Sequence, residues 1–400
     1  MIVRKNSLNK SFLAAIALAV VIGPVGQAAP KAIAIKPMVQ LTKDLTAEGM
    51  AVTNKAIITY ANIVGKNSDI QLRAIDFSGV QIWSKTIDSG RDEVATSISV
   101  DPQGSIWLAG NSASATLSET FTAIAGALNP DSVTVEVPTE IRGDMNQMTL
   151  WQFSPLGDLL IQIDLKTTQP ALVDGISVNT TGVSILISRD SGQSLALVKG
   201  GKLDKEVKIG TSKSRFNSVF RAADGSTSLF GSSSETLGGK KLAGKVDGIL
   251  LKVSKVGSIS SVVRSSAAGA TRDWQSATAT NFLTGVVKSG KKIETAITKF
   301  TLAFSPTWTT RYPSAGTSLA SSGSKGSTFA IFEPTSTPTG VTGWKPKKGQ
   351  SVVLQFDSKG ALIGAFTDLL LSAPFAMGFS AESGIVVLTS SGDILRSSER

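Results

Sequence analysis

The 400-residue chain contains no cysteine and no histidine. Without cysteine there is no disulfide, no thiolate nucleophile and no cysteine-ligated zinc or iron–sulfur cluster. Without histidine there is no Ser-His-Asp triad, no imidazole general base and no imidazole metal ligand. Any catalysis would depend on carboxylates, Lys, Tyr or Ser. We also find no motif for a phosphate-binding loop, an EF-hand, a nucleophile elbow or a zinc protease, and we predict no cofactor and no metal.

Charged residues are also scarce, at 18% of the chain against about 25% in an average soluble domain. Glycine is common, with 38 residues, and hydroxyl side chains are abundant. This composition is typical of an all-β protein with many tight turns. The formal net charge is +10, and Arg4, Lys5 and Lys10 contribute part of it. Such a charge favours weak attraction to anionic polymers, with plain solubility as the alternative.

The first 28 residues have the order of an export signal. Three basic residues precede an apolar stretch over 12–23, and Pro24 and the small residues Gly26 and Ala28 follow. This order predicts a signal peptide over 1–28, cleaved after Ala28. The apolar stretch is short for a membrane span, which needs about 20 residues; an uncleaved anchor is the alternative. We expect an exported chain, secreted or loosely associated with the cell envelope, with no membrane span after cleavage.

Two hairpin patterns alternate along the rest of the chain. The first, an apolar strand, a turn with glycine and a second apolar strand, is clearest in SISVDPQGSIWLAG at 97–110. Glycine in these turns suits a backbone with positive φ. Further copies of the first hairpin cover 175–188, 218–231 and 376–390, and the second hairpin covers 72–87, 150–165, 250–263 and 353–368.

Two hairpins in series make a four-stranded meander, and such units arranged around an axis are the blades of a β-propeller. The chain divides near 47–90, 91–168, 169–213, 214–268, 269–315 and 316–373, and 374–400 has room for three strands. The N-terminal strand at 29–46 can supply the missing one, which also removes exposed sheet edges. We therefore predict an all-β propeller of six to eight blades, seven being favoured, closed by an N-terminal strand. A β-solenoid is the alternative, and the hairpin turns argue against it.

One family resemblance follows from these motifs. Residues 92–110, the Ser/Thr-rich segment after them and DMNQMTLWQFSPLGDLL at 144–160 resemble the bacterial SBBP-type β-propeller repeat. Residues 214–263 repeat the pattern, while 269–311 and 345–368 match more loosely. The resemblance implies a propeller fold and an exported repeat protein. It carries no shared catalytic residue.

The long insertions should gather on one face of the propeller. They lie near 111–145, 232–246 and 333–350, each between the second and third strands of a unit. In a meander these loops share a face with the connections between blades, which is the usual ligand face of the fold. Tolerance of the fold for insertions is the alternative explanation.

The third insertion holds the first candidate ligand site. Trp344 stands beside Lys345, Lys347 and Lys348. A flat aromatic next to cations suits a sugar ring with an anionic substituent, or a base and a phosphate. The alternative is a proline-stiffened loop with the indole packed on the propeller. Lys240 and Lys241 in the second insertion are weaker candidates, because a solvated basic loop has the same composition.

Two Arg-Asp pairs occupy matching positions between units. Arg91-Asp92 and Arg272-Asp273 could reach the channel mouth, or could tie adjacent blades as structural ion pairs. Each Asp-x-x-Gly turn carries one carboxylate, too few for calcium, so we interpret these segments as turns.

These observations predict an exported, non-enzymatic binding propeller. Its partner would be a polymer such as an acidic or neutral glycan, or an envelope protein, without specific nucleic-acid recognition. One alternative is a polysaccharide lyase or glycoside hydrolase that uses two carboxylates, with Asp92, Asp144 and Asp273 as candidates. Another is a structural envelope component that associates through the apolar segment 119–138.

Overall fold

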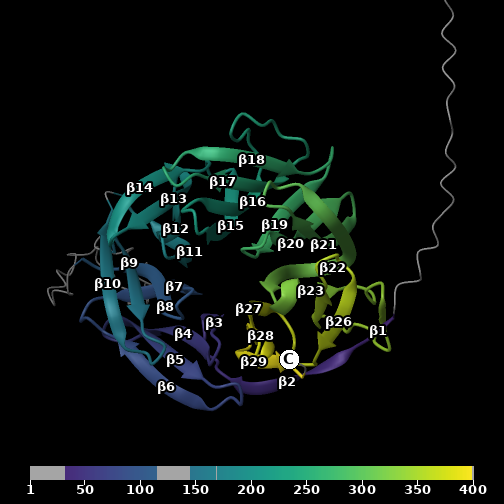
Figure 1. The fold of residues 1–400 in the computed structure, drawn as a ribbon, viewed down its shortest axis with the longest axis horizontal. Helices are drawn as coiled ribbons and strands as arrows, with labels where there is room; N and C mark the ends of the chain where they lie inside the picture. Colours follow the sequence, from purple (N-terminus) through teal and green to yellow (C-terminus); the bar gives the residue numbers. More distant parts are fainter. Residues whose placement is uncertain (1–31, 115–144, 168, 399–400) are drawn as a thin grey trace, which may run out of the picture.

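The computed structural model describes residues 32–114, 145–167 and 169–398. Its strands form a ring of twisted sheets around a central axis (Figure 1). The predicted signal peptide, most of the first insertion and Asp144 lie outside the described residues. No helix within the described part of the chain has the length and apolar character needed to cross a membrane.

Four of the sheets are antiparallel meanders of four consecutive strands. We call them blades 1 to 4 in chain order. Their strands are β3 (Gly49–Val52), β4 (Ile57–Val64), β5 (Ser68–Ile75) and β6 (Gln81–Ile87); β7 (Glu93–Val100), β8 (Ile106–Ser112), β9 (Gln147–Phe153) and β10 (Leu159–Lys166); β11 (Leu172–Asn179), β12 (Gly182–Arg189), β13 (Gly192–Lys199) and β14 (Lys202–Lys208); and β15 (Ser214–Arg221), β16 (Thr227–Ser233), β17 (Asp247–Val253) and β18 (Ile259–Ser265).

Eleven of the remaining strands join into one sheet that contains blades 5 to 7. The long strand β22 pairs with β21 up to Pro313 and with β23 from Ser314 onward, so it is the outer strand of blade 5 and the inner strand of blade 6. In sheet order the strands are β19 (Thr271–Ala277), β20 (Phe282–Ser289), β21 (Lys292–Phe300), β22 (Pro306–Ser322), β23 (Thr328–Pro334), β25 (Val352–Phe356), β26 (Leu362–Thr367), β2 (Lys36–Lys43), β29 (Asp393–Ser397), β28 (Gly384–Thr389) and β27 (Pro374–Ser380).

The N-terminal strand closes the ring. Residues Met38 to Lys43 of β2 pair antiparallel with β29, which makes β2 the outer strand of blade 7. The preceding Lys36 and Pro37 pair parallel with β26 of blade 6. The predicted all-β propeller with N-terminal closure is confirmed. The two-stranded pair of β1 (Ile33–Ala34) and β24 (Val341–Thr342) and the short 3-10 helix η1 (Ser324–Gly326) complete the described elements.

The core consists of seven apolar clusters, one at each junction between neighbouring blades. Alternation along a strand sends successive side chains to opposite junctions. In β12, for example, Ile185 and Ile187 pack toward blade 2, while Leu186 packs toward blade 4. A closed ring with seven junctions has seven blades, and this count does not depend on strand pairing.

The inner strands of blades 2 to 7 each carry a β-bulge where they pair with the second strand of the blade. The pairing register shifts at this position in β7, β11, β15, β19, β22 and β27. In three blades a glycine of the second strand faces the bulge: Gly110, Gly231 and Gly285. A Cβ at any of them would lie closer than 3.0 Å to a carbonyl oxygen of the inner strand. This close approach explains why the repeat has a glycine near the end of its second strand.

Amide side chains join neighbouring blades at their inner ends. Asn62 exchanges two hydrogen bonds with the backbone of Ala95 in the next blade, at 2.8 and 2.9 Å. Asn111 bonds in the same way to blade 3, and Gln193 to blade 4. These bonds satisfy backbone groups of the inner strands that have no sheet partner on the channel side.

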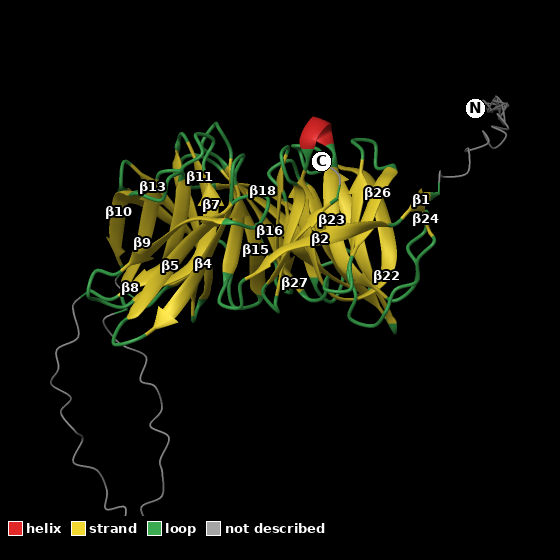
Figure 2. Cartoon of the chain, turned by 90° about the horizontal axis from the view of Figure 1, so that it is seen from below, coloured by secondary structure: helices red, strands yellow, loops and turns green. Residues whose placement is uncertain are grey.

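The two faces of the disc carry different connections (Figure 2). Short turns between first and second strands and between third and fourth strands form the turn face, where η1 also lies. The loops between second and third strands, which are long in blades 2, 4 and 6, share the other face with the connections between blades. We call this second face the loop face.

Candidate functional site

The third insertion, between β23 and β25, forms one wall of a pocket of about 380 Å³. We call it the rim pocket, since its other wall is the N-terminal segment at the outer edge of blade 6. The pocket is lined by Ile35, Lys36, Pro37, Trp344, Lys345, Lys347, Gln350, Thr367, Asp368 and Leu369.

Local hydrogen bonds hold this insertion against the blade. Within it, β24 pairs with β1, so the loop and the N-terminal segment fix each other. Gln350 accepts from the backbone N–H of Lys347 at 3.2 Å and donates to the carbonyl of Asp368 at 3.1 Å. The backbone N–H of Gly349 donates to Glu333 at 2.8 Å. The lysines of the loop therefore extend from an anchored backbone.

Trp344 packs on the propeller and also lines a pocket. Its indole is half-buried against the apolar cluster between blades 5 and 6, and its remaining surface lines the rim pocket. The side chains of Lys345 and Lys347 are exposed at the same pocket. Lys348 is exposed in the adjoining turn and does not line the pocket. No pattern in the sequence pointed to Lys36, which joins this group only because the N-terminal strand passes the insertion.

Lys240 and Lys241 lie on a different blade. Their insertion connects β16 to β17 of blade 4, and both side chains are exposed. Buried Asp247 fastens this loop by accepting from the N–H groups of Ala243 and Gly244, at 2.8 and 2.7 Å, and from Arg264 at 3.0 Å. The structure does not bring this lysine pair to the rim pocket.

The first Arg-Asp pair lies at the junction of blades 1 and 2. Asp92 accepts a hydrogen bond of 2.6 Å from the backbone N–H of Ser68 in blade 1. Arg91 forms an ion pair of 3.6 Å with Asp164 on the outer strand of its own blade, and donates to the carbonyl of Ala113. Asp92 thus contacts the neighbouring blade through a hydrogen bond, and the ion pair of Arg91 stays within blade 2.

The second Arg-Asp pair lies at the junction of blades 4 and 5. Arg272 is buried, lies over the Trp274 ring at 4.9 Å and donates to Ser265 of blade 4 at 2.9 Å. Burial, with a smaller contribution from Arg311, lowers the pKa of Arg272 to about 10. Asp273 accepts from Asn217 at 3.4 Å. Arg272 and Asp273 therefore contact blade 4, and neither is near Trp344.

Among the described residues, two carboxyl groups have raised pKa values, and both lie at the junction of blades 1 and 2. Burial, opposed by Ser89 and Arg91, raises the pKa of Glu93, which is 0% exposed. Burial and Asp88 raise the pKa of Asp69. Because its carboxylate is enclosed, Glu93 cannot reach a polymer on the surface. Asp92 and Asp273, the catalytic candidates that lie within the described residues, are on blades 2 and 5 and do not form a close pair around one bond.

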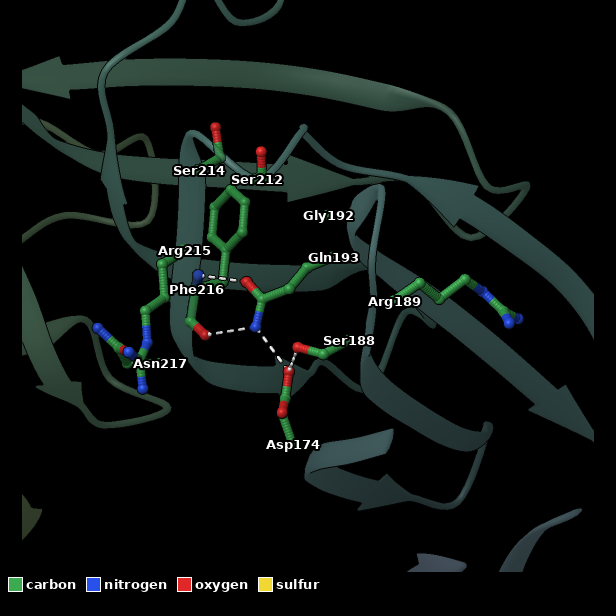
Figure 3. A pocket seen from close by; sticks show the side chains of 10 residues that line it. All are labelled: Asp174, Ser188, Arg189, Gly192, Gln193, Ser212, Ser214, Arg215, Phe216 and Asn217. Atoms are coloured by element: carbon green, nitrogen blue, oxygen red, sulfur yellow. Dashed lines mark hydrogen bonds between the residues drawn. The ribbon is translucent and has the colours of Figure 1, made fainter. Parts of the chain in front are cut away.

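A second pocket on the loop face was missed by the sequence reasoning. It lies between blades 3 and 4 and has a volume of about 440 Å³. Figure 3 shows Gln193 between the Phe216 backbone and Asp174, with Ser188 also directed at Asp174. Arg189 at its edge is bound to Glu206 through two hydrogen bonds, at 3.1 and 2.9 Å. Most of these polar groups hydrogen-bond to one another, so this pocket mainly stabilises the contact between blades 3 and 4.

The Asp-x-x-Gly segments are turns, as predicted. Asp76 accepts from the N–H groups of Ser78 and Val80, and Asp101 from those of Gln103 and Ser105. Over the described ranges no group of three or more acidic side chains is placed to hold a metal ion.

Comparisons with known proteins identify the fold. Neither a family model nor a curated relative matches the chain, so the SBBP resemblance is not confirmed. Among solved structures, a streptogramin B lyase is similar with a TM-score of 0.53 and 11% identity over 90% of this chain and 96% of that one. A catalytically inactive virginiamycin B lyase variant from Staphylococcus aureus, with quinupristin, gives 0.51 and 11% over 90% and 97%. The WD40 domain of Toxoplasma gondii coronin gives 0.49 and 12% over 92% and 87%. The first two likenesses show a β-propeller.

Proposed function

We propose that this chain is an exported binding propeller that takes an anionic glycan at the rim pocket. The observation that carries the proposal is the convergence of Trp344, Lys345 and Lys347 on one pocket. Most small ligand sites combine an apolar wall with a few placed polar groups, and this pocket has that composition.

The anchoring of the loop supports a binding role. Ordering a mobile loop opposes association, and a wall that is already fixed avoids that cost. Trp344 is held by packing against the blade, and the loop backbone is held by Gln350 and Glu333. The lysine side chains supply positive charge without burying it, so their contribution should be screened by salt.

The lyase-like neighbours do not suggest a reaction for this chain. The catalytically inactive variant with quinupristin has an alanine in place of a histidine. The present chain has no histidine. A shared fold at this identity therefore supports a scaffold rather than the chemistry of that enzyme.

A binding screen tests this proposal. The chain from residue 29, which holds every described residue, is titrated with acidic and neutral glycans at low and high salt. We expect saturable binding of an acidic glycan that Trp344→Ala and the double variant Lys345→Ala/Lys347→Ala each weaken by about tenfold or more, as loss of a favourable contact of about 1.4 kcal/mol would do.

The matched control is Lys240→Ala/Lys241→Ala, which removes the same charge from an exposed loop on blade 4. If this control weakens binding as much as the rim variant, the charge acts diffusely and the rim pocket is not the site. Absence of binding to every glycan in the panel would also contradict the proposal.

A further inference from the structure

A pocket on the turn face has a different electrostatic character from the rim pocket. It lies between blades 3 and 4, with a volume of about 630 Å³. Short turns of both blades form its walls, and it is separated from the rim pocket by blade 5 and by the thickness of the disc. We call it the turn-face pocket.

A fixed guanidinium forms part of this pocket. Arg221 donates through Nε to the Thr181 hydroxyl at 3.1 Å, through Nη2 to the Thr181 carbonyl at 2.9 Å and through Nη1 to Ser184 at 3.1 Å. A guanidinium has five N–H donors, so two remain after these three bonds. The side chain is thus oriented before any ligand arrives.

Three lysines surround the same space. Lys199, Lys205 and Lys255 line the pocket with exposed side chains from both blades. Lys205 also donates to the carbonyl of Val256 at 3.1 Å, which holds its ammonium at the wall.

Two carboxylates, Asp204 and Asp224, oppose these four cations. Asp224 is engaged by its own turn, since one of its oxygens accepts from the N–H and hydroxyl of Ser226 at 2.8 and 2.6 Å. Hydrogen bonds from Ser226 lower the pKa of Asp224, so it remains a carboxylate at neutral pH. The formal charge of the lining is four positive against two negative, which leaves a net excess of two.

We propose that the turn-face pocket binds a tetrahedral oxyanion, the phosphate or sulfate group of an ester. Arginine and lysine donors that approach from several directions suit an anion with oxygens on every side, and a fixed guanidinium offers paired donors to two of those oxygens. This site is distinct from the glycan site proposed above, because it involves other blades and the opposite face.

The test uses inorganic phosphate and inorganic sulfate as probes, with the chain from residue 29. Binding is measured by calorimetry and by the shift in unfolding temperature, because a ligand that binds only the folded state stabilises it. We expect saturable binding that the double variant Lys199→Ala/Lys255→Ala weakens by about tenfold. These exposed side chains can be removed without disturbing the core, whereas Arg221→Ala also cuts the bonds to Thr181 and Ser184.

Arg221→Lys gives a second measurement. It keeps the charge and loses the fixed pair of donors, so binding should weaken while the folded state persists. The rim variant Lys345→Ala/Lys347→Ala is the control and should bind both probes normally. Equal weakening in the rim variant, or no saturable binding of either probe, would overturn the proposal. If it holds, the tighter probe shows whether the natural group is a phosphate or a sulfate ester, and glycan binding by the turn-face variant stays intact.

Discussion

Replacing Asn111 tests whether side-chain amides hold the blades together. Asn111 is 5% exposed and lies in blade 2. It donates to the carbonyl of Ala171 at 2.6 Å and accepts from the N–H of Val173 at 3.2 Å, both in blade 3. Both of these residues are buried as well.

The magnitude follows from the groups left behind. Asn111→Ala orphans one buried N–H and one buried carbonyl, and each unsatisfied group costs about 1–3 kcal/mol. We therefore expect a loss of about 2–6 kcal/mol in the free energy of unfolding. Asn217→Ala is the matched control: Asn217 is exposed and donates a 2.8 Å bond to the Trp274 carbonyl. This change orphans one carbonyl, that of buried Trp274, and no N–H, so it should cost about 1–3 kcal/mol, less than Asn111→Ala.

Urea unfolding followed by tryptophan fluorescence measures the free energies, and an unchanged slope shows that the same surface is exposed in each variant. Native-state hydrogen exchange at the Val173 amide gives a local measurement, since this N–H should lose protection in Asn111→Ala. If Asn111→Ala costs no more than Asn217→Ala and the Val173 amide stays protected, the amide contacts do not stabilise the ring.

Three further predictions concern stability. Gly110→Ala should cost at least about 3 kcal/mol of unfolding free energy, because its Cβ would overlap the carbonyl of Val94. At Gly104 a Cβ meets open space, so Gly104→Ala should cost only about 1–2 kcal/mol for the positive φ. Thermal unfolding of both variants distinguishes steric overlap from backbone strain. Burial tends to raise the pKa of Asp247, but hydrogen bonds from backbone N–H groups and Arg264 outweigh it and lower the pKa. The stabilisation from this carboxylate is therefore present above about pH 4 and is lost as the pH falls. Asp247→Asn should be less stable than wild type at pH 7 and should lose less unfolding free energy on acidification. Burial raises the pKa of Glu93, so ionising this buried carboxyl lowers the stability of the fold as the pH rises. Glu93→Gln should be at least as stable as wild type at pH 7, and its stability should change less between pH 4.5 and 7. A stability loss at pH 7 like that of Asp247→Asn would contradict this.

The sequence predicted the fold because its signals are local and repeated. Alternating apolar residues and turns such as the one at Asp101 identify hairpins without knowledge of their neighbours. The strand β2 was predictable because the last unit lacked a fourth strand. These signals depend on backbone geometry that each unit repeats.

Contacts between blades were not predictable in the same way. Asn111 and Ala171 are 60 residues apart, and nothing in either segment identifies the other as its partner. Lys36 reaches Trp344 only through the closure of the ring. The cation–π contact of Arg272 with the Trp274 ring was also missed, because sequence proximity to Asp273 suggested an ion pair instead.

Closure by β2 also has a consequence for the order of events during synthesis. Gln40 of β2 donates to Asp393 of β29, and these residues are 353 positions apart. At about 5–20 residues per second, the ribosome needs roughly 20–70 s to make the chain between them. Throughout this interval the antiparallel part of β2 has been made but β29 does not yet exist, while blades 1 to 6 can form in turn. The antiparallel part of β2 is thus made early and paired only when β29 appears, and its unpaired edge should be the natural target of a chaperone during folding.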